Sequence, residues 1–158
     1  MKTIVVFYSR TGNTKFVAEK VAQELGTETE ELIDLKNRNG IFSFFTNGAD
    51  STREKKTRLA PTTKNPRDFD LVVLGTPVWN ARPTPAMRTY LGDKDLSGKK
   101  VAIFCANMGK SGEEAIARTK SLIPGCDYVE HLVVSQPRKN TAESEHKIAE
   151  WCGKLRSV

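Results

Sequence analysis

Cysteine and histidine are scarce in this chain. Its 158 residues include three cysteines and two histidines. Cys105, Cys126 and Cys152 are odd in number and lack C-x-x-C spacing, which argues against a disulfide framework and against a zinc site. We expect three reduced, mostly buried thiols. Because His131 and His146 are the only histidines, a multi-histidine metal site is not expected.

Long apolar runs are also missing. No stretch approaches the roughly 18 consecutive apolar residues of a membrane-spanning helix, and no signal peptide is visible. We therefore expect a cytoplasmic protein without a membrane span. The length of 158 residues predicts a single domain over 1–158, large enough to bury a core.

Acidic residues are fewer than basic residues in this chain. The chain has 25 lysines and arginines against 19 acidic residues, a net charge of +6. The basic residues gather between Lys36 and Arg67 and again between Arg138 and Arg156. A basic balance suits nucleic acid or an acidic protein. No helix-turn-helix, zinc-finger or aromatic RNA-binding signature accompanies it, so nucleic acid is not expected. An acidic protein partner and a simply solvated basic face remain as alternatives.

Short apolar segments alternate with helix-length segments along the chain. Strands separated by helices predict an α/β fold with a parallel sheet and right-handed crossovers. The most charged of the strands, residues 27–35, suits an edge of that sheet. The predicted strands are residues 4–7, 27–35, 71–75, 100–105 and 128–134, with a last helix after Asn140.

Two of the helices have clear sequence signals. Val17, Val21 and Leu25 recur at i, i+4 and i+8 and predict an amphipathic helix directly after the first strand. Ser111 and Glu114 have the spacing of a capping box, which predicts a helix that starts there and ends at Pro124–Gly125.

The segment Asn39 to Asn65 does not follow the alternating pattern. Phe42, Phe45 and Ala49 share one helical face, so a crossover helix followed by a polar loop is the simpler interpretation. An exposed patch for a partner or a membrane surface is the alternative.

The loop between the first strand and the first helix has the composition of a phosphate site. Backbone N–H groups at the start of a helix lack intrahelical partners and favour an anion. The loop matches neither the Walker pattern nor G-x-G-x-x-G, and a plain capped helix start is the alternative. Its polar and small residues are Ser9, Arg10, Thr11, Gly12, Asn13 and Thr14.

Two further loops follow the third and fourth strands. A doubly wound sheet binds its ligands beyond the carboxyl ends of the strands, where the strand order reverses. In the first of these loops, Gly75 to Pro85, Trp79 is suited to stack on a flat ring, although it could instead pack over the sheet edge. In the second, Cys105 to Ser111, Gly109 allows close backbone approach. One loop for a phosphate and two for a planar heterocycle predict a mononucleotide site.

These loops resemble those of the flavodoxin-like family, which binds flavin mononucleotide (FMN). The motifs Y-S-R-T-G-N-T at 8–14, G-T-P-V-W-N at 75–80 and F-C-A-N-M-G at 104–109 match in order and spacing. The resemblance covers nearly the whole chain. It implies a flavodoxin-like, doubly wound five-stranded parallel sheet of order 2-1-3-4-5, with helices on both faces and FMN at the switch between the first and third strands, an arrangement that flavodoxin exemplifies.

The resemblance also implies a set of cofactor-binding residues and no catalytic or metal-binding ones. The residues implied to hold the phosphate are Ser9, Arg10, Thr11, Gly12, Asn13 and Thr14. Those implied to flank the isoalloxazine ring are Thr76, Pro77, Val78, Trp79 and Asn80 on one side, and Ala106, Asn107, Met108 and Gly109 on the other side or at the pyrimidine edge.

The chain departs from electron-carrier flavodoxins in two respects. Such flavodoxins are typically acidic, whereas this chain is basic. Their third loop often carries a stacking tyrosine, which is missing here, so stacking would fall to Trp79, alone or with Met108. The resemblance implies a low-potential electron carrier that works with redox partner proteins, and the charge suggests acidic ones.

The alternative is a small FMN-dependent NAD(P)H:quinone or nitro reductase of the same fold. The G-T-P-V-W-N form of the second loop resembles that of some such enzymes. Reductases of this fold usually carry extra segments that build a substrate pocket, and only Asn39 to Asn65 could serve as one here. A redox-silent FMN-binding module is a third possibility that no residue specifically favours.

Overall fold

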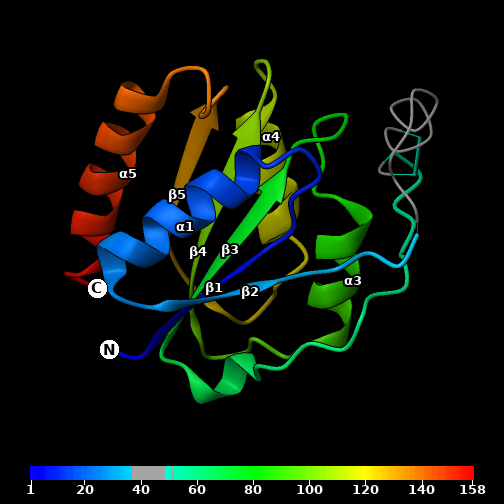
Figure 1. Ribbon diagram of the computed structural model, residues 1–158. Coiled ribbons are helices and arrows are strands. Elements are labelled where there is room, and N and C mark those ends of the chain that lie inside the picture. The colour runs from blue at the N-terminus through cyan, green and yellow to red at the C-terminus, as the bar shows by residue number, and fades with distance from the viewer. Residues whose placement is uncertain (37–48, 51) are drawn as a thin grey trace.

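The computed structural model describes residues 1–36, 49–50 and 52–158. Within these residues the chain forms one five-stranded parallel sheet, in the order β2-β1-β3-β4-β5 (Figure 1). The fold class and strand order predicted from the sequence are therefore confirmed. The strands are β1 (Thr3–Phe7), β2 (Glu28–Glu31), β3 (Leu71–Pro77), β4 (Lys100–Asn107) and β5 (Asp127–Ser135).

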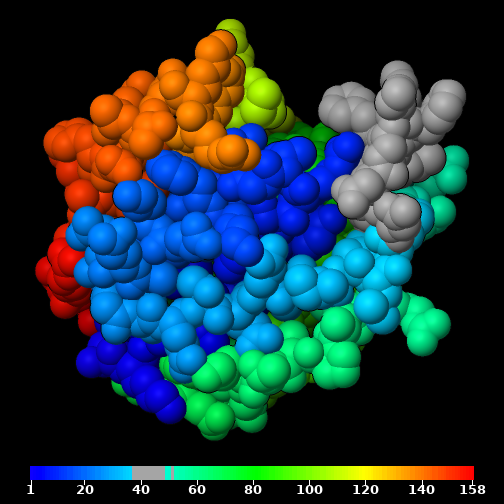
Figure 2. Space-filling view, viewed as in Figure 1, coloured from blue at the N-terminus to red at the C-terminus, as the bar shows by residue number. Residues whose placement is uncertain are grey.

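Helices cover both faces of the sheet. Figure 1 shows α1 and α5 together on one face, with α3 and α4 on the other, and Figure 2 shows α1 and α5 covering the face turned to the viewer. The described helices are α1 (Asn13–Leu25), α3 (Pro85–Asp93), α4 (Gly112–Lys120) and α5 (Thr141–Leu155), with a 3₁₀ turn at Pro66–Asp68.

The central strands are apolar because both of their faces are buried. Successive side chains of a strand point to opposite faces. Ile4 and Val6 of β1 accordingly join the core beneath α3 and α4, whereas Val5 and Phe7 join the core beneath α1 and α5. All four are at most 1% exposed. The prediction of a sheet buried on both sides is confirmed.

The second strand is at the edge, as predicted, but it is shorter than residues 27–35. It ends at Glu31 because its neighbour β1 ends at Phe7 and offers no further backbone partners. The last contact is the Leu32 N–H, which donates to the Phe7 carbonyl at 2.7 Å. Beyond it the chain leaves the sheet, and Asp34 forms an isolated antiparallel bridge with Leu59.

Helix boundaries agree with the sequence only in part. Pro85 is the first residue of α3, as expected, with the Thr84 hydroxyl accepting from the Met87 N–H. Ser111 is the N-cap of α4, but its side chain makes no capping hydrogen bond, because its backbone (φ −95°, ψ 21°) lies outside the extended region that a capping side chain needs. The helix also ends at Lys120, before the predicted Pro124–Gly125.

Asn140 is the N-cap of α5, as predicted, and it too makes no side-chain capping bond. Of the crossover helix predicted around Phe42 and Phe45, most lies outside the described residues. The described part after it, residues 53–65, is mostly irregular, in keeping with the predicted polar loop. No helix in the described ranges is long and apolar enough to cross a bilayer.

The cysteines are unpaired, and burial raises the pKa of each thiol. For Cys152 the pKa rises to about 12, and the Cys105 thiol is also buried and shifted upward. Such thiols stay protonated and unreactive near neutral pH.

Candidate functional site

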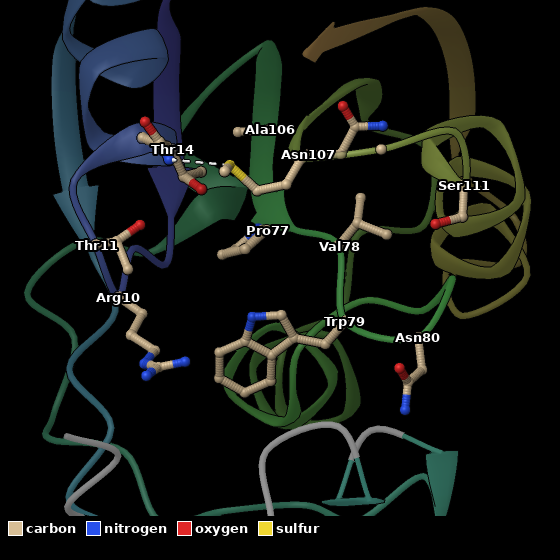
Figure 3. Close-up of a pocket in the computed structure, with 13 residues that line it drawn as sticks. Arg10, Thr11, Thr14, Pro77, Val78, Trp79, Asn80, Ala106, Asn107 and Ser111 are labelled. Atoms are coloured by element: carbon tan, nitrogen blue, oxygen red, sulfur yellow. Dashed lines mark hydrogen bonds between the residues drawn. The ribbon is translucent and has the colours of Figure 1, made fainter. Parts of the chain in front are cut away.

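A pocket of about 570 Å³ lies beyond the carboxyl ends of β1, β3 and β4 (Figure 3). Three adjacent parallel strands end there, so their loops meet at the same edge of the sheet. All the site residues predicted from the sequence line this pocket except Ser9, Gly12 and Thr76. The lining residues are Arg10, Thr11, Asn13, Thr14, Pro77, Val78, Trp79, Asn80, Ala106, Asn107, Met108, Gly109 and Ser111.

The loop after β1 presents the open N-terminus of α1 to the pocket. Gly12 is the N-cap with φ +90°, a left-handed conformation that glycine adopts without strain. The first intrahelical bond runs from the Phe16 N–H to the Gly12 carbonyl. The N–H groups of Asn13, Thr14 and Lys15 precede it, so the helix itself offers them no acceptor. This end of α1 therefore favours an anion.

Ser9 and Gly12 shape this loop from behind the pocket. The Ser9 hydroxyl accepts a hydrogen bond from the Gly12 N–H at 3.2 Å, which closes the turn that starts α1. Ser9 is thus oriented toward the loop backbone, and its predicted contact with a phosphate stays a prediction.

Two polar side-chain atoms of the pocket wall are buried and unsatisfied. Among the described residues, neither the Thr14 hydroxyl nor the Asn107 amide oxygen has a hydrogen-bond partner. Thr14 is 1% exposed and Asn107 is 6% exposed. Buried polar groups are nearly always paired in native proteins, and an unpaired one costs about 1–3 kcal/mol. A ligand with oxygen acceptors near α1 and a donor near β4 would satisfy both atoms.

Arg138 is a residue that the sequence did not point to. It lies in the loop between β5 and α5, and its Nη1 donates to the Thr11 carbonyl at 3.1 Å. Figure 2 shows this loop, in orange, against the blue loop that precedes α1. A side chain at Gly12 would come within 3.1 Å of the same Nη1 atom. Arg138 thus supports the loop and adds positive charge next to the start of α1.

The loop after β3 is a tight hairpin that carries Trp79. The N–H groups of Trp79 and Arg82 each donate to the other's carbonyl at 3.1 Å, and Asn80 and Ala81 between them have φ of +49° and +59°. This is the geometry of a type I′ turn. The Trp79 ring stands edge-on to Tyr8, with ring centroids 5.9 Å apart and an interplanar angle of 87°.

Trp79 lines the pocket with its ring toward Arg10 across the opening (Figure 3). It also packs against the core beneath α3 and α4, so the two roles considered from the sequence are not exclusive. Thr76 is fully buried beneath the loop, where its hydroxyl accepts from the Thr84 N–H at 3.2 Å. Thr76 therefore holds the hairpin in place rather than lining the pocket.

The loop after β4 forms the third side of the pocket. The Val78 N–H donates to the Ala106 carbonyl at 3.2 Å and ties this loop to the hairpin. Met108 is 71% exposed, and its sulfur lies 3.9 Å from the Asn13 side-chain nitrogen (dashed in Figure 3). Ser111 also lines the pocket, and its position at the end of the loop Cys105 to Ser111 was the signal that could have identified it.

The described residues that line the pocket are mostly uncharged. Among them Arg10 alone carries an ionisable side chain. The arrangement offers an anion site, an aromatic ring and backbone groups that can bind and orient a ligand.

Comparison with known families identifies the chain. The model of the NADPH-dependent FMN reductase family matches residues 1–140. The chain belongs to this family. Comparison with curated proteins found no match. For this FMN reductase family member, the predicted use of FMN is confirmed at the level of the family, and the unsatisfied Thr14 hydroxyl at an open helix N-terminus fits a phosphate-bearing ligand.

Solved structures share the fold at low sequence identity. A protein from Bacteroides eggerthii, provisionally described as a flavoprotein, has a TM-score of 0.82 and 21% identity over 99% of this chain and 98% of its own. A Lactobacillus acidophilus flavoprotein in complex with FMN has a TM-score of 0.71 and 21% identity over 89% and 98%. Oxidised flavodoxin 1 from Bacillus cereus has a TM-score of 0.60 and 19% identity over 99% and 98%. At these identities the likeness shows the fold alone.

Proposed function

We propose that this protein holds one FMN in the pocket and carries electrons between partner proteins, as a flavodoxin does. The observation that supports FMN most directly is the buried, unpartnered hydroxyl of Thr14 at the open start of α1. A phosphate would accept from this hydroxyl and from the helix N–H groups at once.

The flavin supplies the redox chemistry, and the residues of this chain bind, orient and shield it. Thr11, Asn13 and Thr14 border the proposed phosphate position, with Arg138 supporting the loop. Trp79 supplies an aromatic surface for the ring system. Asn107 contributes an amide oxygen that can accept from a ring or ribityl donor.

A carrier role is supported by what lines the pocket and by what surrounds its mouth. An electron carrier needs no proton donor, and none of the described residues that line the pocket is an Asp, Glu, His, Cys, Lys or Tyr. Arg10 lines the pocket. Exposed Lys110 lies in the loop after β4, and exposed Arg138 lies beside the loop after β1. These cations favour an acidic redox protein as the partner.

An anaerobic reductive titration of the FMN-loaded protein, run beside assays with NADH and NADPH, tests the carrier role. A carrier should be reduced rapidly by an electron-transfer protein and only slowly by either nucleotide, with menadione or ferricyanide as the final acceptor. Failure to retain FMN at one per chain would refute the proposal at its first step.

A second function, an NADPH-dependent flavin reductase, is favoured by the family match itself. The same assay separates the two. Rapid, saturable NADPH oxidation by the purified protein alone would assign it to the reductases.

A further inference from the structure

Arg82 and Arg88 lie together beside the pocket. Arg82 ends the hairpin that carries Trp79, and its Nη1 donates to the Asn80 carbonyl at 3.4 Å. Because Trp79 and Asn80 line the pocket, Arg82 borders the rim. Arg88 is in the first turn of α3, directly after this hairpin.

Both guanidinium groups face one carboxylate oxygen. Glu54 Oε1 is 3.9 Å from Arg82 Nε and 3.6 Å from Arg88 Nη2. These distances are longer than the roughly 2.7–2.9 Å of a charge-assisted hydrogen bond. The side chain of Glu54 is 56% exposed, whereas those of Arg82 and Arg88 are 22% and 10% exposed. One loosely held, exposed carboxylate therefore serves two largely buried cations.

The two arginines are also short of acceptors. Among the described residues, the Nε atoms of Arg82 and Arg88 are buried without a hydrogen-bond partner. By contrast, the guanidinium of Arg118 on α4 has an acceptor for its Nε. Its Nε and Nη2 donate to Glu114 at 3.1 and 2.7 Å. A buried charged donor without an acceptor is costly. The Arg82–Arg88 pair is thus incompletely neutralised, with the exposed Glu54 carboxylate facing both guanidinium groups.

The backbone around the pair is held in place on both sides. The Thr57 N–H donates to the Thr89 hydroxyl on α3 at 2.8 Å, and that hydroxyl donates to the Thr57 carbonyl at 3.1 Å. The segment that carries Glu54 therefore runs alongside α3 (Figure 1). Glu54 itself has φ +55°, a strained conformation for a non-glycine residue. Displacing its side chain leaves the backbone anchored through Thr57.

We propose that Arg82 and Arg88 form a second oxyanion site, which binds the phosphate group of a small molecule beside the flavin and displaces Glu54. Two planar guanidinium groups match the geometry of a phosphate, which can accept from both. The inference rests on the proposed function in one respect, because FMN must already fill the anion site at α1. The phosphate is either free or carried on a nucleotide, and the chemistry is the same for both.

Calorimetric titration of the FMN-loaded protein with inorganic phosphate and with ADP, at constant ionic strength, tests the site. We expect one saturable site per chain, and Arg88→Gln should weaken it by about tenfold, the loss of one charge-assisted hydrogen bond. Arg82→Gln should act in the same direction. Glu54→Gln removes the competing carboxylate and should tighten binding severalfold. Arg118→Gln, which removes a paired arginine on α4, should change nothing.

The sign of the Glu54→Gln effect is decisive. If Glu54 only forms structural ion pairs with Arg82 and Arg88, Glu54→Gln brings no gain in anion binding, and the inference is wrong. The inference is also wrong if neither phosphate nor ADP binds saturably to the FMN-loaded wild-type protein. It is likewise wrong if polyglutamate binds while phosphate and ADP do not. Equal affinity for both probes identifies free phosphate as the ligand, and tighter ADP binding identifies a nucleotide. Visible absorbance measured beforehand reports FMN occupancy, so a failure to load FMN counts against the proposed function instead.

Discussion

The Thr14 hydroxyl is the side-chain atom on which the proposed ligand depends most. It is buried at the start of α1 and has no acceptor among the described residues. Such an atom lowers the stability of the empty protein by about 1–3 kcal/mol. The same atom gains a charge-assisted bond when a phosphate arrives. Stability of the empty protein and affinity for FMN should therefore respond to this hydroxyl in opposite directions.

Thr14→Val tests this opposition, because valine keeps the shape of threonine and removes only the hydroxyl. We expect FMN to bind about tenfold or more weakly, in line with roughly 1.5–3 kcal/mol for a bond to a charged group. Riboflavin, which lacks the phosphate, should bind as before, and the empty protein should unfold at a higher temperature. Thr14→Ser is the control that retains the hydroxyl. Equal losses for FMN and riboflavin in calorimetry would show that Thr14 does not contact the phosphate.

Trp79 should report the flavin directly. Its ring lines the pocket and is held by the hairpin hydrogen bonds to Arg82. Its fluorescence should be quenched as FMN binds, and Trp79→Ala should weaken binding by roughly 1–3 kcal/mol, the range for stacking on a planar base. Trp79→Phe should recover part of the affinity. Trp151 also emits, so the titration is compared with that of the alanine variant. Unchanged affinity in Trp79→Ala would leave Trp79 with a packing role against Tyr8 only.

The sequence predicted the pocket loops well because their signals are local. A strand, a polar turn and a helix follow one another within Thr3 to Leu25, and chain order alone brings them together. It could not predict the contact of Arg138 with Thr11, because these residues are 127 positions apart. It also could not show that the Ser9 and Thr76 hydroxyls accept from backbone N–H groups of their own loops, and the contact of Ser9 with a phosphate stays a prediction. Which partner a hydroxyl chooses depends on the folded backbone.

Secondary-structure elements were predictable where both faces are buried. β3 and β4 are mostly apolar, and the sequence located them to within two residues at each end. β2 was predicted too long, because its end is determined by the length of β1 rather than by its own residues. The capping signal at Ser111 located the start of α4 but not the geometry of the cap. A strand or helix end is thus set by its neighbours as well as by its sequence.

Close packing between β3 and β4 leaves no room for a side chain at Gly75. A Cβ atom there would lie 2.1 Å from Phe104 Cζ. Gly75→Ala should therefore destabilise the protein by about 1–3 kcal/mol through overpacking, as measured by thermal or urea unfolding. Combining it with Phe104→Leu should restore part of the loss.

Gly153 in α5 provides the matched control. A Cβ atom at Gly153 would have no neighbour within 4 Å, so Gly153→Ala should stabilise the protein by roughly 0.5–1 kcal/mol through higher helix propensity. Similar effects of the two glycine substitutions would mean that the gap beside Phe104 is larger than the structure indicates.

The charge of the whole molecule bears on its choice of partner. The net charge is +6, and the described part of the pocket lining contains a cation and no carboxylate. Exposed Lys110 lies in the third loop, whereas exposed Lys154 on α5 lies on the other side of the sheet. A protein partner attracted by the pocket mouth would be affected by the first lysine far more than by the second.

Lys110→Glu should therefore slow electron transfer to an acidic redox protein and flatten the dependence of that rate on salt. Most of the effect should disappear above roughly 0.1 M salt, where the Debye length falls to about 10 Å. Lys154→Glu changes the net charge equally and should leave both rate and salt slope nearly unaltered. Equal effects of the two variants in stopped-flow measurements would assign the basic charge to solubility rather than docking.

The pairing of β1 with β3 has a consequence for the order of assembly. Thr3 pairs with Leu71, so the two strands that flank the pocket meet only after a long segment of chain has closed on itself. Such non-local contacts form slowly and late in folding. FMN can therefore load only onto a completed sheet, and it should lower the unfolding rate while leaving the folding rate unchanged. Stopped-flow folding and unfolding with and without FMN would measure both rates, and faster folding with FMN would mean that the site forms before the sheet is complete.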